Sequence, residues 1–207
     1  MRLEMLNPPY GPVDTERMDR FRVGDANGEY VPLYSVRLMV KHHPDLAEAM
    51  RKTAWLFLDT STSTLDLPTR EIVVARTLAR CRCEYQWGIH QAVFGDAAGF
   101  DEARRVAVVY GDWDDPVWDE QQRSLVRAVD EIFDSSTLRD ETWNALASFL
   151  SPRQVLESLA LIGWYQLNSY LSSAVQLPLE SFALRFPPPP VAASAAVPAA
   201  AGAGRSN

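Results

Sequence analysis

Three side chains that can move protons or electrons lie within one stretch of twenty residues: Glu71, Cys83 and His90. An imidazole titrates near neutral pH, so His90 can act as an acid or a base. A carboxylate can orient the imidazole or relay its proton, and a cysteine thiolate is a nucleophile. Together in one groove, these groups would suffice for proton transfer at an acidic carbon or for thiol redox chemistry.

The spacing of these residues predicts how helices would position them. Cys83 and His90 are seven residues apart, close to two turns of an α-helix, so they would face the same way about 10 Å apart along the axis. Cys83 is expected at the start of its helix, where the positive end of the helix dipole favours a thiolate. Glu71 is expected in the first turn of the preceding helix, and a hairpin of the two helices would return it toward the imidazole or the thiol.

Each of these residues also has a structural interpretation. A glutamate in a first turn complements the helix dipole, a single cysteine packs as a small buried apolar group, and a single histidine on a helix face is commonly a hydrogen-bonded structural residue. Cys81 and Cys83 with one histidine do not match the ligand spacing of a zinc site. We therefore expect no metal and no organic cofactor.

Helical periodicity dominates the chain from residue 33, and no segment of any length has the alternation of a strand, so the sequence predicts an all-α fold. Asp66 is expected to cap the third helix, with Pro68 in its first turn. This helix is apolar on most sides and is therefore expected to be central. Arg80–Arg82 is expected to be a tight break. The helices are expected at 33–41, 45–58, 66–79, 83–94, 101–109, 117–133, 139–150 and 152–175.

The composition divides the chain into three parts. Residues 1–32 contain proline or glycine every few positions, which predicts an irregular arm that is either loose or laid across a partner subunit. Residues 33–186 are expected to form one helical domain. Residues 187–207 are almost entirely proline and alanine with scattered serine and glycine, which predicts a disordered tail.

Charge and hydropathy exclude several classes of protein. The formal net charge of −7 and the lack of a basic block argue against nucleic-acid binding. No apolar run approaches the roughly 18 residues that would span a bilayer, so no membrane segment is expected. The N-terminus lacks the apolar stretch of a secretory signal, and two cysteines do not make a disulfide framework. We expect a soluble, cytoplasmic protein.

The segment REIVVARTLARCRCEYQWGIH, residues 70–90, resembles the signature helix pair of the carboxymuconolactone decarboxylase and alkylhydroperoxidase D-like family. A weaker likeness extends over about 33–179. The resemblance implies an all-α domain built around a central helix hairpin, a homo-oligomer (a trimer or a hexamer) and a small-molecule substrate. It places Glu71, Cys83 and His90 in the catalytic role and Arg70, Tyr85, Gln86 and Trp87 around the substrate. The matching positions are Arg70, Glu71, Cys81, Glu84, Tyr85, Trp87, Gly88 and His90.

Two activities are associated with this family. One branch decarboxylates small unsaturated lactone acids by acid–base chemistry, and the other reduces peroxides with a Cys-x-x-Cys pair. The second cysteine of that pair falls on Gln86 here, and decarboxylase-like members often carry an acid at the same position. A carboxylate substrate would favour cationic groups near the pocket, with Arg70 or Arg76 as candidates, whereas a dry apolar pocket would suit a hydrophobic peroxide.

Three hypotheses follow from the sequence. The first is a decarboxylase-like enzyme that carries out decarboxylation, or a related lyase or isomerase step, on a small unsaturated acid or lactone. In it His90 is the acid or base, and Glu71 orients it or shuttles its proton. The second is a thiol peroxidase in which Cys83 attacks the peroxide. The third is a non-catalytic oligomeric binding protein that keeps the fold.

Overall fold

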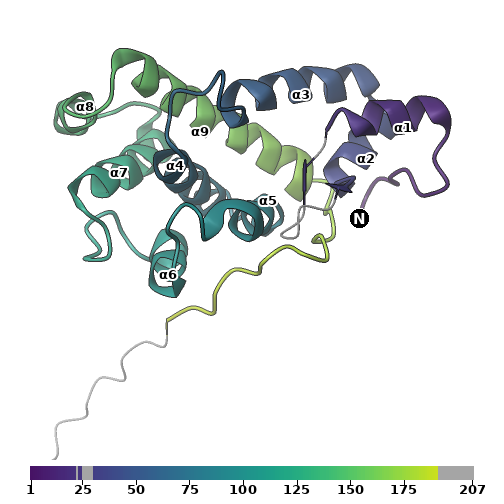
Figure 1. The fold of residues 1–207 in the computed structure, drawn as a ribbon. Helices are drawn as coiled ribbons and strands as arrows, with labels where there is room; N and C mark the ends of the chain where they lie inside the picture. The colour runs from purple at the N-terminus through teal and green to yellow at the C-terminus, as the bar shows by residue number, and fades with distance from the viewer. Residues whose placement is uncertain (22, 25–29, 191–207) are drawn as a thin grey trace, which may run out of the picture.

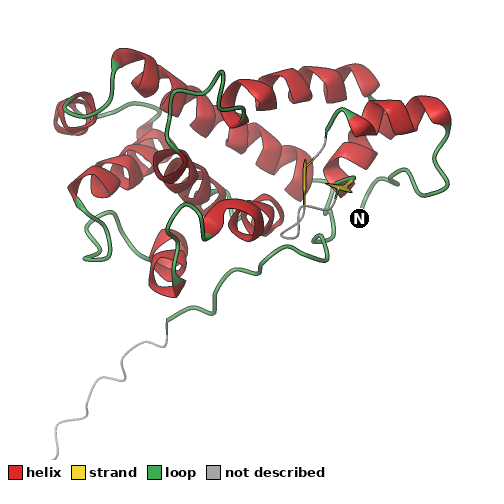
Figure 2. Ribbon diagram, viewed as in Figure 1, coloured by secondary structure: helices red, strands yellow, loops and turns green. Residues whose placement is uncertain are grey.

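A computed structural model describes residues 1–21, 23–24 and 30–190 of the chain, and the predicted tail beyond residue 190 lies outside them. The prediction of an all-α fold is confirmed (Figure 2). The only strands among the described residues are β1 (Val23–Gly24) and β2 (Tyr30–Val31), which pair antiparallel. The helices are α1 (Pro12–Asp19), α2 (Tyr34–His42), α3 (Pro44–Leu58), α4 (Leu67–Arg80), α5 (Glu84–His90), α6 (Glu102–Tyr110), α7 (Glu120–Ser135), α8 (Asp140–Ala147) and α9 (Pro152–Ser173), with a π-helix η1 (Gln91–Gly95) directly after α5.

Helix α4 is central, as its apolar sequence predicts. It packs against α5, α6, α7 and α9 (Figure 1). Every residue from Arg70 to Leu78 is buried. The Asp66 side chain accepts a hydrogen bond from the backbone N–H of Thr69, which caps the helix as expected. Glu71 is thereby fixed in the core of the molecule and not on a solvent-facing first turn.

The turn between α4 and α5 forms the predicted tight break. Arg82 adopts a left-handed conformation with φ 52°. The N–H of Cys83 donates to the carbonyl of Leu78, and that of Arg82 to the carbonyl of Ala79. This pair of bonds is a Schellman motif, which satisfies the last carbonyls of α4 and reverses the chain. The reversal returns α5 against α4, so the two helices form the expected hairpin.

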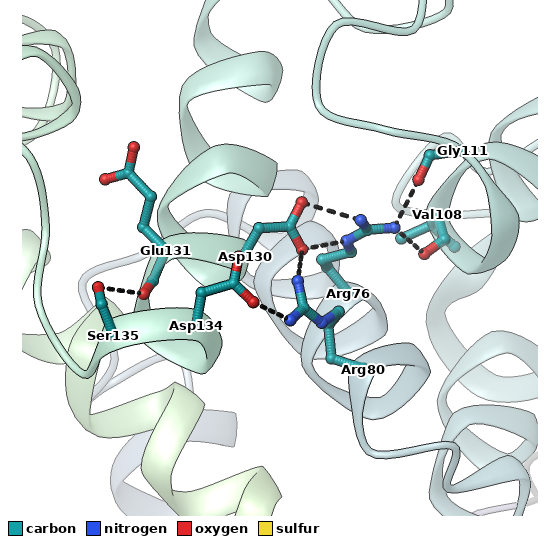
Figure 3. Close-up of polar contacts among 8 residues, drawn as sticks. All are labelled: Arg76, Arg80, Val108, Gly111, Asp130, Glu131, Asp134 and Ser135. Carbon is teal, nitrogen blue, oxygen red and sulfur yellow. Dashed lines mark hydrogen bonds and ion pairs between the residues drawn. The ribbon is translucent and has the colours of Figure 1, made fainter.

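A polar cluster around Arg76 and Arg80 holds α4 against its neighbours (Figure 3). Arg76 binds Asp130 of α7 through both Nε and Nη2 at 2.8 Å. Its Nη1 donates to the carbonyls of Val108 and Gly111, at 3.0 and 2.9 Å. Arg80 continues the cluster to Asp130 at 2.9 Å. Because its guanidinium is buried and bonded on all sides, Arg76 is a structural residue and not the substrate ligand that the sequence suggested.

The N-terminal arm is more ordered than predicted. Helix α1 and the β1–β2 pair lie within residues 1–32, so the expectation of an irregular segment is wrong there. The first residues pack on this chain's own α2 and on the end of α9: Arg37 donates to the carbonyl of Leu6 at 2.7 Å, and the N–H of Arg2 donates to the carbonyl of Val175 at 2.8 Å. Among the described residues, no helix combines the length and apolarity needed to cross a bilayer.

Three local expectations need correction. The helix predicted at 83–94 is α5 followed by the π-helical turn η1. Helix α7 begins at Glu120 and not at Val117, because Asp119 and Gln122 form a reciprocal capping box. The helix predicted at 139–150 ends three residues earlier, because α8 covers Asp140–Ala147.

Candidate functional site

Glu71 and His90, the acid and the imidazole singled out from the sequence, form one buried hydrogen-bonded pair. The His90 Nδ1 lies 2.8 Å from Oε2 of Glu71. On the other side of the carboxylate, Arg70 Nε donates to Oε1 of Glu71 at 2.9 Å. His90 Nε2 lies 2.8 Å from the hydroxyl of Tyr165. Side chains of α4, α5 and α9 therefore form a continuous chain, Arg70–Glu71–His90–Tyr165, which we call the relay.

The hydrogen bonds of the relay select one tautomer of neutral His90. A carboxylate only accepts hydrogen bonds, so the ring nitrogen facing Glu71 must carry the proton. In the neutral imidazole, Nε2 is then an acceptor and receives the O–H of Tyr165. If His90 takes up a second proton, Nε2 becomes a donor and the Tyr165 oxygen accepts from it. The relay can thus exist in two protonation states without breaking any bond.

Tyr165 remains a proton donor in this site. Burial, reinforced by the negative charge of Glu71, raises the pKa of its hydroxyl well above the ordinary value for tyrosine. The phenol consequently keeps its proton at neutral pH. Tyr165 could not be linked to His90 from the sequence, because it lies 75 positions later in the chain. Its only sequence signal is a position on the buried face of α9, between Ile162 and Ser169.

The π-helical turn after α5 places an aromatic side chain against two residues of the relay. Phe94 projects from η1 so that its ring centroid lies 5.0 Å from the guanidinium carbon of Arg70. The same ring lies 5.4 Å from the His90 imidazole. The negative face of an aromatic ring attracts a guanidinium, so Phe94 helps to hold Arg70 against Glu71. Such π-turns are often found at functional sites.

Cys83 is not part of the relay. It is the residue directly before α5, as predicted, but its side chain is only 1% exposed. Both ring nitrogens of His90 are already bonded to Glu71 and Tyr165, so neither is free for the thiol. Cys81 and Cys83 are both free cysteines, and burial raises the pKa of the Cys81 thiol. The structure thus brings together two of the three predicted catalytic residues and leaves the thiol apart.

The four predicted substrate-binding residues have different surroundings. Arg70 belongs to the relay. The Tyr85 hydroxyl donates to Glu180 at 2.6 Å, and burial raises the pKa of both groups. Trp87 is fully buried, with the Phe186 ring edge-on at 5.1 Å. Gln86 borders a cavity. Tyr85 and Trp87 therefore attach the C-terminal segment to α5, and Gln86 alone is both near the relay and beside open space.

Comparison with known proteins adds no further assignment: no family model matches the chain, and no curated protein matches it. Among the described residues, no three His, Cys, Asp or Glu side chains are grouped closely enough to hold a metal ion. Glu71, Cys83 and His90 do not line any of five surface pockets in the described part of the chain. The interpretation of the site accordingly depends on its geometry.

The environment of the two thiols makes a testable prediction about their reactivity. The thiolate is the reactive form. Burial raises the pKa of the Cys81 thiol, and the Cys83 side chain is only 1% exposed to a reagent. We expect neither Cys81 nor Cys83 of the native protein to react with a thiol reagent at pH 8 at the rate of a free cysteine. Both should react fully after unfolding in guanidinium. Native labelling of Cys83 as fast as that of the unfolded chain would contradict its burial.

Proposed function

We propose that this protein is a decarboxylase-like enzyme that moves protons by acid–base catalysis on a small unsaturated acid or lactone. The proposal is carried by one observation, the buried chain of hydrogen bonds from Arg70 through Glu71 and His90 to Tyr165. An imidazole held between a carboxylate and a hydroxyl can accept a proton and return it. Glu71 would stabilise the imidazolium that forms, and Arg70 would hold the Glu71 side chain in place through its hydrogen bond.

The proposed reaction uses the relay first as a base and then as an acid. The Tyr165 oxygen takes the proton of the substrate's carboxyl group while its own proton passes to Nε2 of His90, which becomes an imidazolium beside Glu71. The bond to the departing carboxylate then breaks, and its electron pair stays on the substrate carbon as carbon dioxide leaves. Reversal of the transfer delivers the proton through Tyr165 to that carbon. The relay ends in its starting state, and no electron is exchanged.

The same geometry ranks the alternatives. A peroxidase that uses Cys83 would require a thiol close to a base, whereas the nitrogens of His90 are bonded elsewhere and Cys83 is buried. The non-catalytic hypothesis would account for the relay as a structural cross-link of α4, α5 and α9. The three hypotheses predict different effects of the variants described below on turnover and on peroxide consumption.

The proposal is tested by proton exchange in heavy water. A panel of small unsaturated acids and lactones is incubated with the protein, and deuterium incorporation and loss of carbon dioxide are followed by NMR. We expect Glu71→Gln, His90→Gln and Tyr165→Phe to lower the rate by about 10²–10⁴-fold, the usual contribution of a positioned acid or base. Cys83→Ser should retain the activity. Full turnover by folded His90→Gln would refute acid–base catalysis, and peroxide consumption that depends on Cys83 would favour the peroxidase.

We also propose that the protein is a homo-oligomer. Support comes from α9, where Leu156, Leu167 and Tyr170 are 67%, 42% and 59% exposed. Ala160 and Gly163 lie between them, so the exposed residues follow alternating steps of four and three, the spacing of a helix–helix seam. Light scattering should give a mass above that of one chain, and Leu167→Glu should lower it.

A further inference from the structure

A cavity of about 140 Å³ lies beside α5, and Gln86 is the residue of that helix that lines it. Its walls come from α2, α3, α5 and α9, and Leu3 of the N-terminal segment covers part of it. The volume is close to that of an engineered protein cavity of about 150 Å³ that binds benzene. The space is therefore suited to one small molecule and not to a peptide.

The lining of this cavity is mostly aliphatic. Six of the described residues along it have apolar side chains: Leu3, Leu38, Met39, Leu46, Leu171 and Val175. No lysine or arginine is among the residues that line it, and the ionisable ones are His42 and His43. His42 Nε2 is bonded to the carbonyl of Glu4 at 2.7 Å, and His43 Nδ1 accepts from the N–H of Leu46 at 3.2 Å. A carboxylate would lose its hydration here without gaining a guanidinium or ammonium partner, which is unfavourable.

Polar groups gather at one wall of the cavity. The Gln86 amide Nε2 lies 3.4 Å from Oγ of Ser172, a long hydrogen bond. The Ser172 hydroxyl donates to the carbonyl of Asn168 at 2.9 Å, so it is already satisfied as a donor. The Gln86 amide is consequently the group best able to exchange its weak bond for one to a carbonyl or hydroxyl oxygen of a bound molecule.

The polar wall lies close to the relay. Gln86 precedes His90 by four residues on α5, and Asn168 follows Tyr165 by three residues on α9. Residues three or four apart are neighbours on one face of a helix, separated by about 5–6 Å along the axis. Neither His90 nor Tyr165 lines the cavity itself, but each has a cavity-lining residue one turn away on its own helix.

We propose that this cavity binds the substrate, and that the substrate is a small uncharged molecule with an apolar ring or chain and one oxygen held by Gln86. The assignment of the ligand as a substrate rests on the proposed function, whereas its binding does not. Within the proposed substrate classes, the cavity favours a neutral lactone over a free acid. A neutral lactone has no carboxylate to lose. With this substrate the relay takes a proton from an acidic carbon and returns it to a neighbouring carbon, an isomerisation in which no carbon dioxide leaves.

Fluorine NMR titration of the full chain tests the binding. The probes are para-fluorobenzyl alcohol and para-fluorobenzoate, which share a ring and differ in charge. We expect the alcohol to bind at least about tenfold more tightly than the benzoate, a difference of about 1.4 kcal/mol. Equal affinities, or binding of neither probe, would overturn the proposal.

Variants locate the bound probe. Leu171→Phe and, independently, Leu46→Phe fill the cavity and should each weaken binding of the alcohol by about tenfold or more. Leu56→Phe is the matched control, because Leu56 is 50% exposed on α3, the helix that carries Leu46, and does not line the cavity, so the affinity should be unchanged. Gln86→Met should weaken the alcohol severalfold. Binding that survives both filling variants would place the probe elsewhere and refute the assignment.

The relay variant separates this inference from the proposed function. Tyr165→Phe should abolish turnover while the probe binds as it does to the unchanged protein. If the probe binds in the cavity but relay variants turn over substrates normally, the catalytic proposal fails and the binding site stands. If relay variants lose turnover but filling the cavity leaves the KM of a neutral substrate unchanged, the substrate assignment fails alone.

Discussion

Replacement of Glu71 by alanine is expected to lower the free energy of unfolding by about 3–5 kcal/mol, the cost of removing one partner of a buried ion pair. The Glu71 side chain is fully buried and that of Arg70 is only 7% exposed. Without the carboxylate, the Arg70 guanidinium would remain in the core with no opposite charge, and His90 Nδ1 would lose its acceptor. Urea denaturation followed by circular dichroism measures the change.

The double variant Arg70→Met, Glu71→Ala provides the control. Removing both charges eliminates the unpaired guanidinium, so part of the lost stability should return. Glu157 is a less deeply buried acid with which Glu71 can be compared. Its carboxylate accepts hydrogen bonds from Ser63 and Thr64, nearer the surface. A loss of less than about 1 kcal/mol for Glu71→Ala, typical of surface pairs, would mean that the relay is open to water.

The second large effect is expected at Gly88, where α5 meets the C-terminal segment. A Cβ at this position would lie 2.1 Å from the backbone oxygen of Leu184. The N–H of Leu184 donates to the carbonyl of Gly88, and Phe186 packs against Trp87 two residues later. Gly88→Ala must push this segment off α5, so we expect a loss of about 3 kcal/mol, at the upper end of the usual cost of overpacking. Thermal and urea unfolding both report it.

Gly163 is the matched control for Gly88. It also lies inside a helix, but a Cβ there would meet nothing within 4 Å. In the dissociated single chain, where the proposed α9 seam is unoccupied, Gly163→Ala should therefore raise the free energy of unfolding by about 0.5–1 kcal/mol, the intrinsic helix preference of alanine over glycine. If the two substitutions change stability in the same direction by similar amounts, the segment around Leu184 does not pack on α5 in solution.

The helices that carry the site could be predicted because their signals are local. Asp66 and Pro68 mark the start of α4, its apolar run marks it as central, and the break at Arg82 gives the hairpin. From these elements the proximity of Glu71 and His90 followed as an expectation. Local spacing could not decide which groups occupy the two nitrogens of His90, because that depends on how α9 crosses α5.

Other features depended on contacts between distant segments. Tyr165 reaches His90 from a helix 75 residues later, and a tyrosine on an apolar helix face has no distinctive sequence pattern. The charge of Arg76 suggests a substrate ligand when only the sequence is known, because its partner Asp130 lies 54 residues away. The arm acquires its order from bonds such as that between Leu6 and Arg37, which no local pattern of glycine and proline reveals.

The tautomer of His90 is the most direct test of the relay, and long-range proton–nitrogen NMR of the nitrogen-labelled protein determines it. We expect neutral His90 to carry its proton on Nδ1, facing Glu71. We also expect Glu71→Gln or Tyr165→Phe to perturb the ring resonances more than Cys83→Ser does. A neutral His90 protonated on Nε2, or a ring insensitive to Glu71 and Tyr165, would contradict the relay.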